Sequence, residues 1–118
     1  MTPPHPALIL LGRKWSVPIL QELGRSPKGF EDLRRSLSGI SPRVLSLEVT
    51  QLSTHGLVLY QPLPEARHLH GAPRTRYSLT TKGKDVLRTI GVLQDVLDNR
   101  TNVPLFNYID AKLTSRKA

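Results

Sequence analysis

The middle of the chain, residues 29–57, carries apolar positions at the spacing of an α-helix in two successive blocks. The apolar positions of the first block are Phe30, Leu33 and Leu37. Those of the second block are Val44, Leu45, Val49 and Leu52. Each set falls on one face of a helix, so the pattern predicts two short amphipathic helices that pack against a common core.

The residues between the two blocks are typical of a tight turn. Gly39 can adopt the left-handed conformation that a sharp turn needs. Ser41 is a good N-cap and Pro42 suits the first helical position, so a helix is predicted over about 41–55. Proteins whose second helix enters the DNA major groove have this layout, although a packing corner in any helical bundle has it too.

The chain before this pair predicts a tail and two helical segments. Proline-rich residues 1–6 indicate an extended, loosely held tail, and apolar residues 7–11 indicate one or two helical turns. Ser16 as an N-cap, with Pro18 in the first turn, predicts a helix that ends at Gly24. The expected buried residues of that helix are Ile19, Leu20 and Leu23.

The segment after the pair predicts a β-hairpin. Residues 57–63 are rich in β-branched and aromatic side chains, and Pro62 places that end at a sheet edge. The second strand alternates between two faces, one with Thr75, Tyr77 and Leu79 and the other with Arg74, Arg76 and Ser78. The hairpin and its long loop, over about 62–76, have the shape of a wing.

A further helix is predicted after the hairpin, with Thr80 or Thr81 as its N-cap. Its expected apolar stripe is Val86, Leu87, Ile90, Leu93 and Leu97. Residues 99–104 interrupt the pattern, and a last amphipathic helix is predicted over about 104–113. The chain is therefore interpreted as a single domain over 1–118, with its core over about 8–98.

The predicted order is helix, helix, helix, strand, loop, strand, helix, helix. A hairpin directly after the second helix of the pair separates a winged helix-turn-helix from a generic bundle. Five blocks carry a resemblance to a known family: LGRKWSVPIL at 11–20, FEDLRRSL at 30–37, GISPRVLS at 39–46, HGLV at 55–58 and RYSLT at 76–80 with Lys82 and Gly83. On these blocks the sequence resembles the HxlR family of winged helix-turn-helix transcription regulators, which are MarR-like.

The resemblance implies a fold that is mainly α with a small β-hairpin wing, in a homodimeric bacterial or archaeal DNA-binding regulator of transcription. The N- and C-terminal helices would form the dimer interface, and both carry apolar residues that a small domain has no room to bury. The resemblance places the recognition helix, about 41–55, in the major groove and the wing on the flanking minor groove or backbone. The recognition helix departs from the family at Leu47, Glu48 and Thr50, where members often carry polar or basic residues.

Composition adds a strong charge signal. The chain has 17 Lys and Arg against 9 Asp and Glu, a formal net charge of +8 that attracts phosphate polymers and anionic membranes alike. No basic amphipathic helix and no apolar run near ~18 residues favours a membrane, and no secretory signal is expected. With no Cys, the chain excludes disulfides, Cys-type zinc sites and the thiol switch of some family members, and a cytoplasmic location is expected.

The residues expected to contact double-stranded DNA lie on three elements. Those of the recognition helix are Ser41, Pro42, Arg43, Ser46 and Thr50. Those of the wing are Arg67, His68, His70, Arg74 and Arg76. On the first helix of the pair, Arg34 and Arg35 are expected near backbone phosphate, with pairing to Glu31 or Asp32 one turn earlier as the alternative.

Several of these assignments leave alternatives open. Arg43 could pair with guanine O6 and N7, bind phosphate, or lie in solvent. Leu47 would meet a thymine methyl or belong to the core, depending on the phase of the helix. Glu48 is interpreted as a surface residue rather than as a partner of cytosine N4. Ser41 can cap the helix and bind phosphate together.

No other chemistry stands out in the sequence. His68 and His70 form only an incomplete metal site, so no metal is expected. No nucleophile motif, phosphate-binding loop or paired carboxylates indicate an enzyme or a cofactor, and nothing indicates a small-molecule effector. The alternative functions are a protein-interaction module on the same scaffold and a non-specific nucleic-acid binder, which the salt dependence and sequence preference of DNA binding would distinguish.

Overall fold

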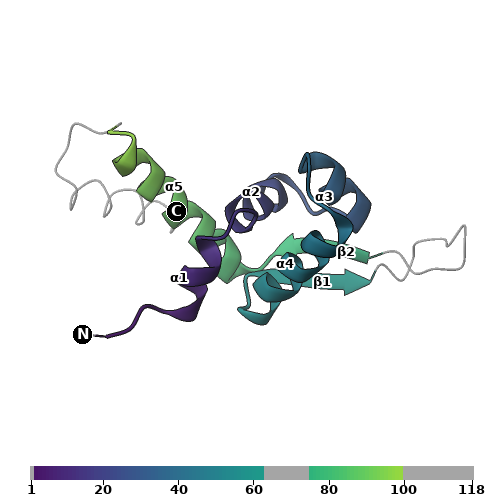
Figure 1. The fold of residues 1–118 in the computed structure, drawn as a ribbon, viewed down its shortest axis with the longest axis horizontal. Helices are drawn as coiled ribbons and strands as arrows, with labels where there is room; N and C mark the ends of the chain where they lie inside the picture. The colour runs from purple at the N-terminus through teal and green to yellow at the C-terminus, as the bar shows by residue number, and fades with distance from the viewer. Residues whose placement is uncertain (1, 63–74, 100–118) are drawn as a thin grey trace, which may run out of the picture.

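The computed structural model describes residues 2–62 and 75–99. The elements are α1 (Pro6–Leu11), α2 (Ser16–Arg25), α3 (Phe30–Ser36), α4 (Pro42–Thr54), β1 (Val58–Pro62), β2 (Thr75–Leu79) and α5 (Thr81–Leu97). Helix α2 packs on α3 and α4, and the hairpin lies against these three helices. In Figure 1 the hairpin and α5 extend from opposite ends of this helical body. The predicted class, mainly α with a β-hairpin after the second helix of the pair, is confirmed.

The centre of the core comes from α2, α3 and α4. The apolar side chains that are almost completely buried are Ile19, Leu20, Leu33, Leu45, Leu52 and Leu57. The stripes predicted for these helices are therefore the buried faces. Burying one such side chain contributes about 1.5–3 kcal/mol, so several on one helix fix which side of α4 remains in solvent. Within the described ranges, no helix has the length and hydropathy needed to cross a membrane.

The turn between α3 and α4 has the predicted geometry. Gly39 has a φ of +94°, in the region that disfavours side chains with a Cβ. The Ser41 hydroxyl accepts a hydrogen bond from the Val44 backbone N at 3.1 Å, and Pro42 is the first helical residue. Ser41 is therefore the N-cap of α4, and the start of the recognition helix lies where the sequence places it.

The start of α2 differs from the prediction, because Ser16 is the first helical residue and not the N-cap. Trp15 occupies the cap position without a side-chain hydrogen bond. The completely buried Ser16 hydroxyl instead donates to the Leu10 carbonyl at 2.6 Å. It therefore satisfies a carbonyl of α1, and this use of the hydroxyl explains why Ser16 is not available as a cap.

The two strands form one antiparallel pair with Val58 opposite Leu79 and Tyr60 opposite Tyr77. The outer edge of β2 is also paired. The Lys28 backbone N donates to the Tyr77 carbonyl at 3.0 Å, and the Tyr77 N donates to the Lys28 carbonyl at 2.8 Å. These bonds tie the hairpin to the loop between α2 and α3, so the base of the wing has a fixed position relative to the helices.

The first turn of α5 closes the base of the hairpin. Thr80 is the N-cap, since its hydroxyl oxygen accepts from the Gly83 backbone N at 2.9 Å. The same hydroxyl donates to the Gly56 carbonyl at 2.6 Å. Gly83 approaches the Leu57 backbone so closely that any Cβ would collide with the Leu57 carbonyl oxygen. A glycine is therefore required where α5 crosses the end of the α4–β1 connection.

The predicted apolar stripe of α5 is only partly buried in the structure. Val86, Leu87 and Ile90 pack against the core, whereas Leu93 and Leu97 are 53% and 70% exposed. Val92, which the predicted stripe omits, is buried. The reason is that α5 extends beyond the helical body, as Figure 1 shows, so its later turns have less of the core to pack on. The helix predicted over 104–113 lies outside the described residues.

Candidate nucleic-acid interface

Most of the described residues that the sequence assigns to DNA contact lie on the solvent face of α4. Its exposed residues are Ser41, Pro42, Arg43, Ser46, Leu47, Thr50, Gln51 and Thr54. The opposite face, with Leu45, Val49 and Leu52, lies in the core. The structure therefore brings Ser41, Pro42, Arg43, Ser46 and Thr50 together on one accessible surface, as expected.

Arg43 lies near the N-terminal end of this face, in the first turn of α4. Its side chain is exposed, and among the described residues it forms no salt bridge. The guanidinium therefore keeps its hydrogen-bond donors for a ligand such as guanine or phosphate.

The threonine hydroxyls on this face are partly committed to the helix. Thr50 Oγ1 donates to the Ser46 carbonyl at 2.8 Å, and Thr54 Oγ1 donates to the Thr50 carbonyl at 2.9 Å. Since each hydroxyl has one proton, these residues can offer a ligand only an acceptor and a methyl group in this geometry.

Glu48 is buried, and its interpretation as a surface residue was wrong. Its side chain is 3% exposed and points toward the turn between α1 and α2. There Arg13 Nη2 lies 2.8 Å from Oε1, and the Ser16 hydroxyl lies 3.4 Å from Oε2. The helix phase turns this carboxylate away from the solvent face, so the one acidic residue of α4 neither repels phosphate nor reaches cytosine.

Arg34 and Arg35 take the alternative that the sequence left open. Arg34 Nη2 lies 2.8 Å from Glu31 Oε1, and Arg35 Nη2 lies 2.6 Å from Asp32 Oδ1. The hydrogen bonds between Arg34 and Glu31 lower the pKa of the carboxyl and raise the pKa of the guanidinium. A phosphate contact by either arginine would have to compete with these pairs, which are solvent-exposed and therefore weak.

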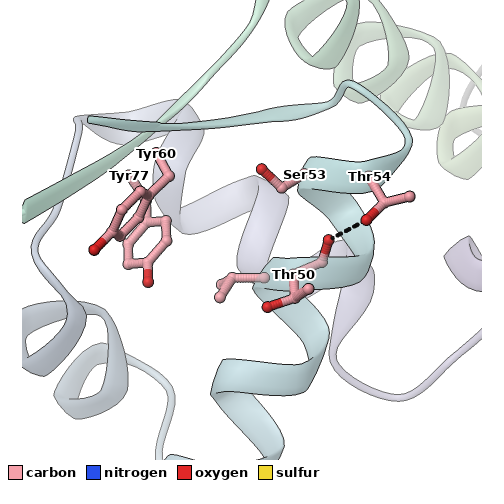
Figure 2. Close-up of a pocket in the computed structure, with 6 residues that line it drawn as sticks. Thr50, Ser53, Thr54, Tyr60 and Tyr77 are labelled. Atoms are coloured by element: carbon pink, nitrogen blue, oxygen red, sulfur yellow. Dashed lines mark hydrogen bonds between the residues drawn. The ribbon is translucent and has the colours of Figure 1, made fainter. Parts of the chain in front are cut away.

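A cleft of about 490 Å³ separates α4 from the hairpin. Figure 2 shows Tyr60 and Tyr77 side by side on one wall, facing Thr50 and Ser53 of α4 on the other. The two tyrosine rings lie 5.1 Å apart between centroids. Partial burial raises the pKa of Tyr77 above its ordinary value. The cleft is lined by Val49, Thr50, Ser53, Thr54, Tyr60 and Tyr77, so it contains hydroxyl groups and no acidic side chain.

The sequence-based site omitted Ser53, Thr54 and both tyrosines. The alternation of β2 did place Tyr77 on the inner face with Leu79, and a hairpin register would have set Tyr60 beside it. The pattern gave no indication that this face stands off from α4 and leaves a cleft.

The structure describes one of the five wing residues that the sequence assigns to DNA contact. Arg76 is exposed and alternates with Tyr77, so it lies on the hairpin face turned away from α4. The structure therefore does not bring Arg76 together with the exposed residues of α4. Arg67, His68, His70 and Arg74 lie outside the described residues, and their contact with DNA stays a prediction.

A three-helix body followed directly by a hairpin, with the second helix of the pair exposed, defines a winged helix-turn-helix protein. The model of a family described as HxlR-like helix-turn-helix matches residues 10–103. The chain belongs to this family, and the resemblance identified from its sequence blocks is confirmed.

Curated relatives are designated HTH-type transcriptional regulators. The uncharacterized HTH-type transcriptional regulator sll1512 of Synechocystis sp. is 36% identical over 77 residues, which cover 65% of this chain and 53% of the relative. The uncharacterized HTH-type transcriptional regulator YvaP of Bacillus subtilis is 31% identical over 85 residues, which cover 72% and 74%. This chain therefore spans about half the length of the first relative and about three quarters of the second.

Solved structures of regulators have the same fold. The reduced form of the transcriptional regulator YodB from B. subtilis aligns with a TM-score of 0.73 at 27% identity, over 86% of this chain and 97% of that chain. A possible HxlR family transcriptional factor from Thermoplasma volcanium aligns with a TM-score of 0.66 at 33% identity, over 84% and 87%.

Proposed function

We propose that this protein is a DNA-binding regulator of transcription that inserts α4 into the major groove. The exposed face of α4 carries this proposal, because it offers Arg43, Ser46 and Thr50 to a ligand while the helix's one acid, Glu48, is buried. The net charge of +8 would attract the DNA backbone at long range. Membership of a helix-turn-helix family and the names of the relatives support the same function.

The cleft between α4 and the hairpin suits a sugar–phosphate strand. When a recognition helix occupies the major groove and a wing reaches the neighbouring minor groove, the strand between the two grooves passes between helix and wing. The phenol groups of Tyr60 and Tyr77 would donate to its phosphate oxygens. A tyrosine hydroxyl at its ordinary pKa is already protonated at neutral pH and can donate such a bond. Partial burial raises the pKa of Tyr77 further in the same direction.

The proposed regulator acts as a homodimer through its terminal helices. A groove of about 600 Å³ between α1 and α5 is lined by Leu8, Leu11, Val17, Val86, Ile90, Leu93 and Leu97, among other residues. Leu8 is 60% exposed and Leu97 is 70% exposed, so a second copy would cover apolar surface. A two-fold dimer predicts a pseudo-palindromic operator whose half-sites lie about one helical turn apart.

Sedimentation tests the dimer separately from DNA binding. We expect a dimer at micromolar concentration and a monomer after Leu93→Asp with Leu97→Asp, since both leucines are exposed and their loss costs the fold little. A wild-type chain that sediments only as a monomer would contradict the dimer.

Selection of bound duplexes from a random DNA pool tests the function itself. We expect enrichment of a two-fold sequence whose affinity falls steeply with salt concentration. Arg43→Ala should reduce binding, whereas the matched control Arg88→Ala, in an exposed ion pair on α5, should not. If the wild-type chain binds no duplex in a salt-dependent way, the proposal is overturned, and a protein partner for the exposed helix is favoured. Salt-dependent binding without sequence preference would indicate a non-specific nucleic-acid binder.

A further inference from the structure

Two rows of side chains run along the solvent face of α4. Residues four apart in a helix lie nearly above one another, so Arg43, Leu47 and Gln51 form one row. Ser46, Thr50 and Thr54 form the other row, in which both threonine hydroxyls donate to helix carbonyls. The first row makes no such bonds among the described residues, so it presents a guanidinium, an isobutyl group and a carboxamide to solvent.

Leu47 is the least expected member of that row. Its side chain is 54% exposed, and the stripe that packs α4 into the core consists of Leu45, Val49 and Leu52. Leu47 is not part of the core cluster or of the residues packed against it, so core packing does not explain a large apolar residue at the centre of this surface. An apolar group there has one counterpart on the major-groove edges of the bases, the C5-methyl group of thymine.

Gln51 lies one turn after Leu47 and is also exposed. Its carboxamide carries a donor and an acceptor side by side. Adenine presents the complementary pair in the major groove, with N7 as acceptor and N6 as donor. Both residues are therefore complementary to the two bases of A·T pairs, while Arg43 at the start of the row matches guanine.

We propose that Leu47 and Gln51 are specificity-determining residues that select A·T pairs in each half-site, Leu47 through the thymine methyl and Gln51 through adenine N6 and N7. This inference rests on the proposed function, because it requires α4 to enter the major groove. Four residues advance a helix by about 6 Å, so the two side chains reach base pairs one or two steps apart.

Single-atom changes in DNA test the proposal with the full chain. The probe is a duplex enriched from the random pool, prepared with deoxyuridine in place of each thymine in turn. Uracil keeps the hydrogen bonds of thymine and lacks only the methyl group. The thymines are replaced one at a time, and we expect a single sensitive position in each half-site. Deoxyuridine at one such position should weaken wild-type binding roughly fourfold, the effect of losing one buried methyl. The Leu47→Ala variant should bind the two duplexes equally well, because it no longer contacts that methyl.

A second replacement tests Gln51. A 7-deaza-adenine lacks the N7 acceptor, and at one position per half-site it should weaken wild-type binding at least about fivefold while leaving Gln51→Ala unaffected. Leu59→Ala is the matched control for Leu47→Ala. Leu59 is an exposed leucine, 42% accessible, on the strand face opposite Tyr60, and its variant should retain the full response to deoxyuridine.

The outcomes separate the two levels of the proposal. Wild-type binding that is unchanged by deoxyuridine at every thymine, or a loss that persists in Leu47→Ala, overturns the role of Leu47. An unchanged response to 7-deaza-adenine overturns the role of Gln51 in the same way. In both cases sequence-specific binding remains, so the proposed function stands. If no duplex is enriched, the proposed function fails and this inference fails with it.

Discussion

The two flanks of α4 are built in opposite ways. On the flank toward α1 and α2, the carboxylate of Glu48 is buried and paired with Arg13 at 2.8 Å, and the Ser16 hydroxyl lies 3.4 Å away. On the flank toward the hairpin, Tyr60 and Tyr77 stand away from the helix and leave a cleft of about 490 Å³. One side of the same helix is closed by a charged contact, and the other side is open to a ligand.

The two flanks therefore have different roles: the Glu48 flank fixes the position of α4 on α1 and α2, and the flank beside the hairpin is free to bind a ligand. The Ser16 hydroxyl touches both Glu48 and the Leu10 carbonyl, so the closed flank connects the recognition helix to α1. A buried pair contributes little net stability compared with apolar packing, but it tolerates few geometries. We therefore expect substitutions on the closed flank to change the stability of the fold, and substitutions on the open flank to change DNA binding alone.

The largest expected effect comes from Arg13→Ala. This change leaves the buried Glu48 carboxylate without its counter-charge, and we expect a loss of about 2–3 kcal/mol in the free energy of unfolding, below the full cost of a buried pair because Arg13 itself is largely exposed. Urea denaturation measures the loss. The neighbour Lys14→Ala is the control, since the Lys14 ammonium lies over the Trp15 ring at 5.2 Å and forms no salt bridge with the part of the chain that the structure describes.

A double variant shows whether the uncompensated charge is the cause. Adding Glu48→Met to Arg13→Ala removes the charge and keeps an apolar side chain of similar length, so most of the lost stability should return. If the double variant is as unstable as Arg13→Ala alone, the loss comes from the turn between α1 and α2 and not from Glu48.

Ser16→Ala should have the next largest effect on stability. The Leu10 carbonyl loses its 2.6 Å hydrogen bond but keeps the one from the Arg13 backbone N at 3.0 Å, and Glu48 loses a contact at 3.4 Å. We therefore expect a loss of about 0.5–1.5 kcal/mol in the free energy of unfolding. Ser46→Ala, at an exposed position of α4, should leave the unfolding free energy nearly unchanged. If Ser16→Ala and Ser46→Ala change the free energy of unfolding equally, the polar contact at Ser16 does not stabilise the closed flank.

The comparison of flanks also explains which features the sequence could predict. The turn at Gly39, the cap at Ser41 and the apolar stripe of α4 are local patterns, and each was predicted correctly. The burial of Glu48 depends on Arg13 and Ser16, which are distant in the chain and reach it only through the packing of α1 and α2. Helical spacing does put Glu48 on the apolar stripe, three residues after Leu45 and four before Leu52. No local pattern names the distant partner that lets a carboxylate be buried there, so the acid was assigned to the surface.

The candidate site, like the fold, could be predicted from the sequence only where a local pattern defines it. Periodicity placed Arg43, Ser46 and Thr50 on one exposed face. The cleft was not predictable, because the gap between Tyr60 and Thr50 depends on where the hairpin is anchored, through the backbone pairing of Tyr77 with Lys28. Helix phase, which the sequence fixes only to within about one residue, also left Leu47 undecided between core and surface.

Arg43→Ala should reduce DNA binding without reducing stability, as expected for a residue between the two flanks. The exposed guanidinium makes no salt bridge with the described residues, so its loss costs the fold little. We expect a loss of about 1–3 kcal/mol in binding to the preferred site and a relaxed preference at one position. Titrations with specific and scrambled duplexes measure both. Equal losses on the two duplexes would mean that Arg43 binds phosphate and reads no base.

The smallest effects are expected from Tyr60→Phe and Tyr77→Phe on the open flank. Each change removes one phenol hydroxyl and keeps the ring, so the packing of the two rings at 5.1 Å and the fold should persist. If the hydroxyls donate to a DNA strand in the cleft, each loss should weaken binding by about 0.5–1.5 kcal/mol. Because a phosphate carries no sequence information, specific and scrambled duplexes should lose affinity equally, unlike the response to Arg43→Ala. Titration of both duplexes, with thermal unfolding as a check on the fold, measures the effect. Unchanged binding in both variants would mean that the strand does not enter the cleft, while a loss confined to the preferred duplex would mean that the tyrosines contact bases.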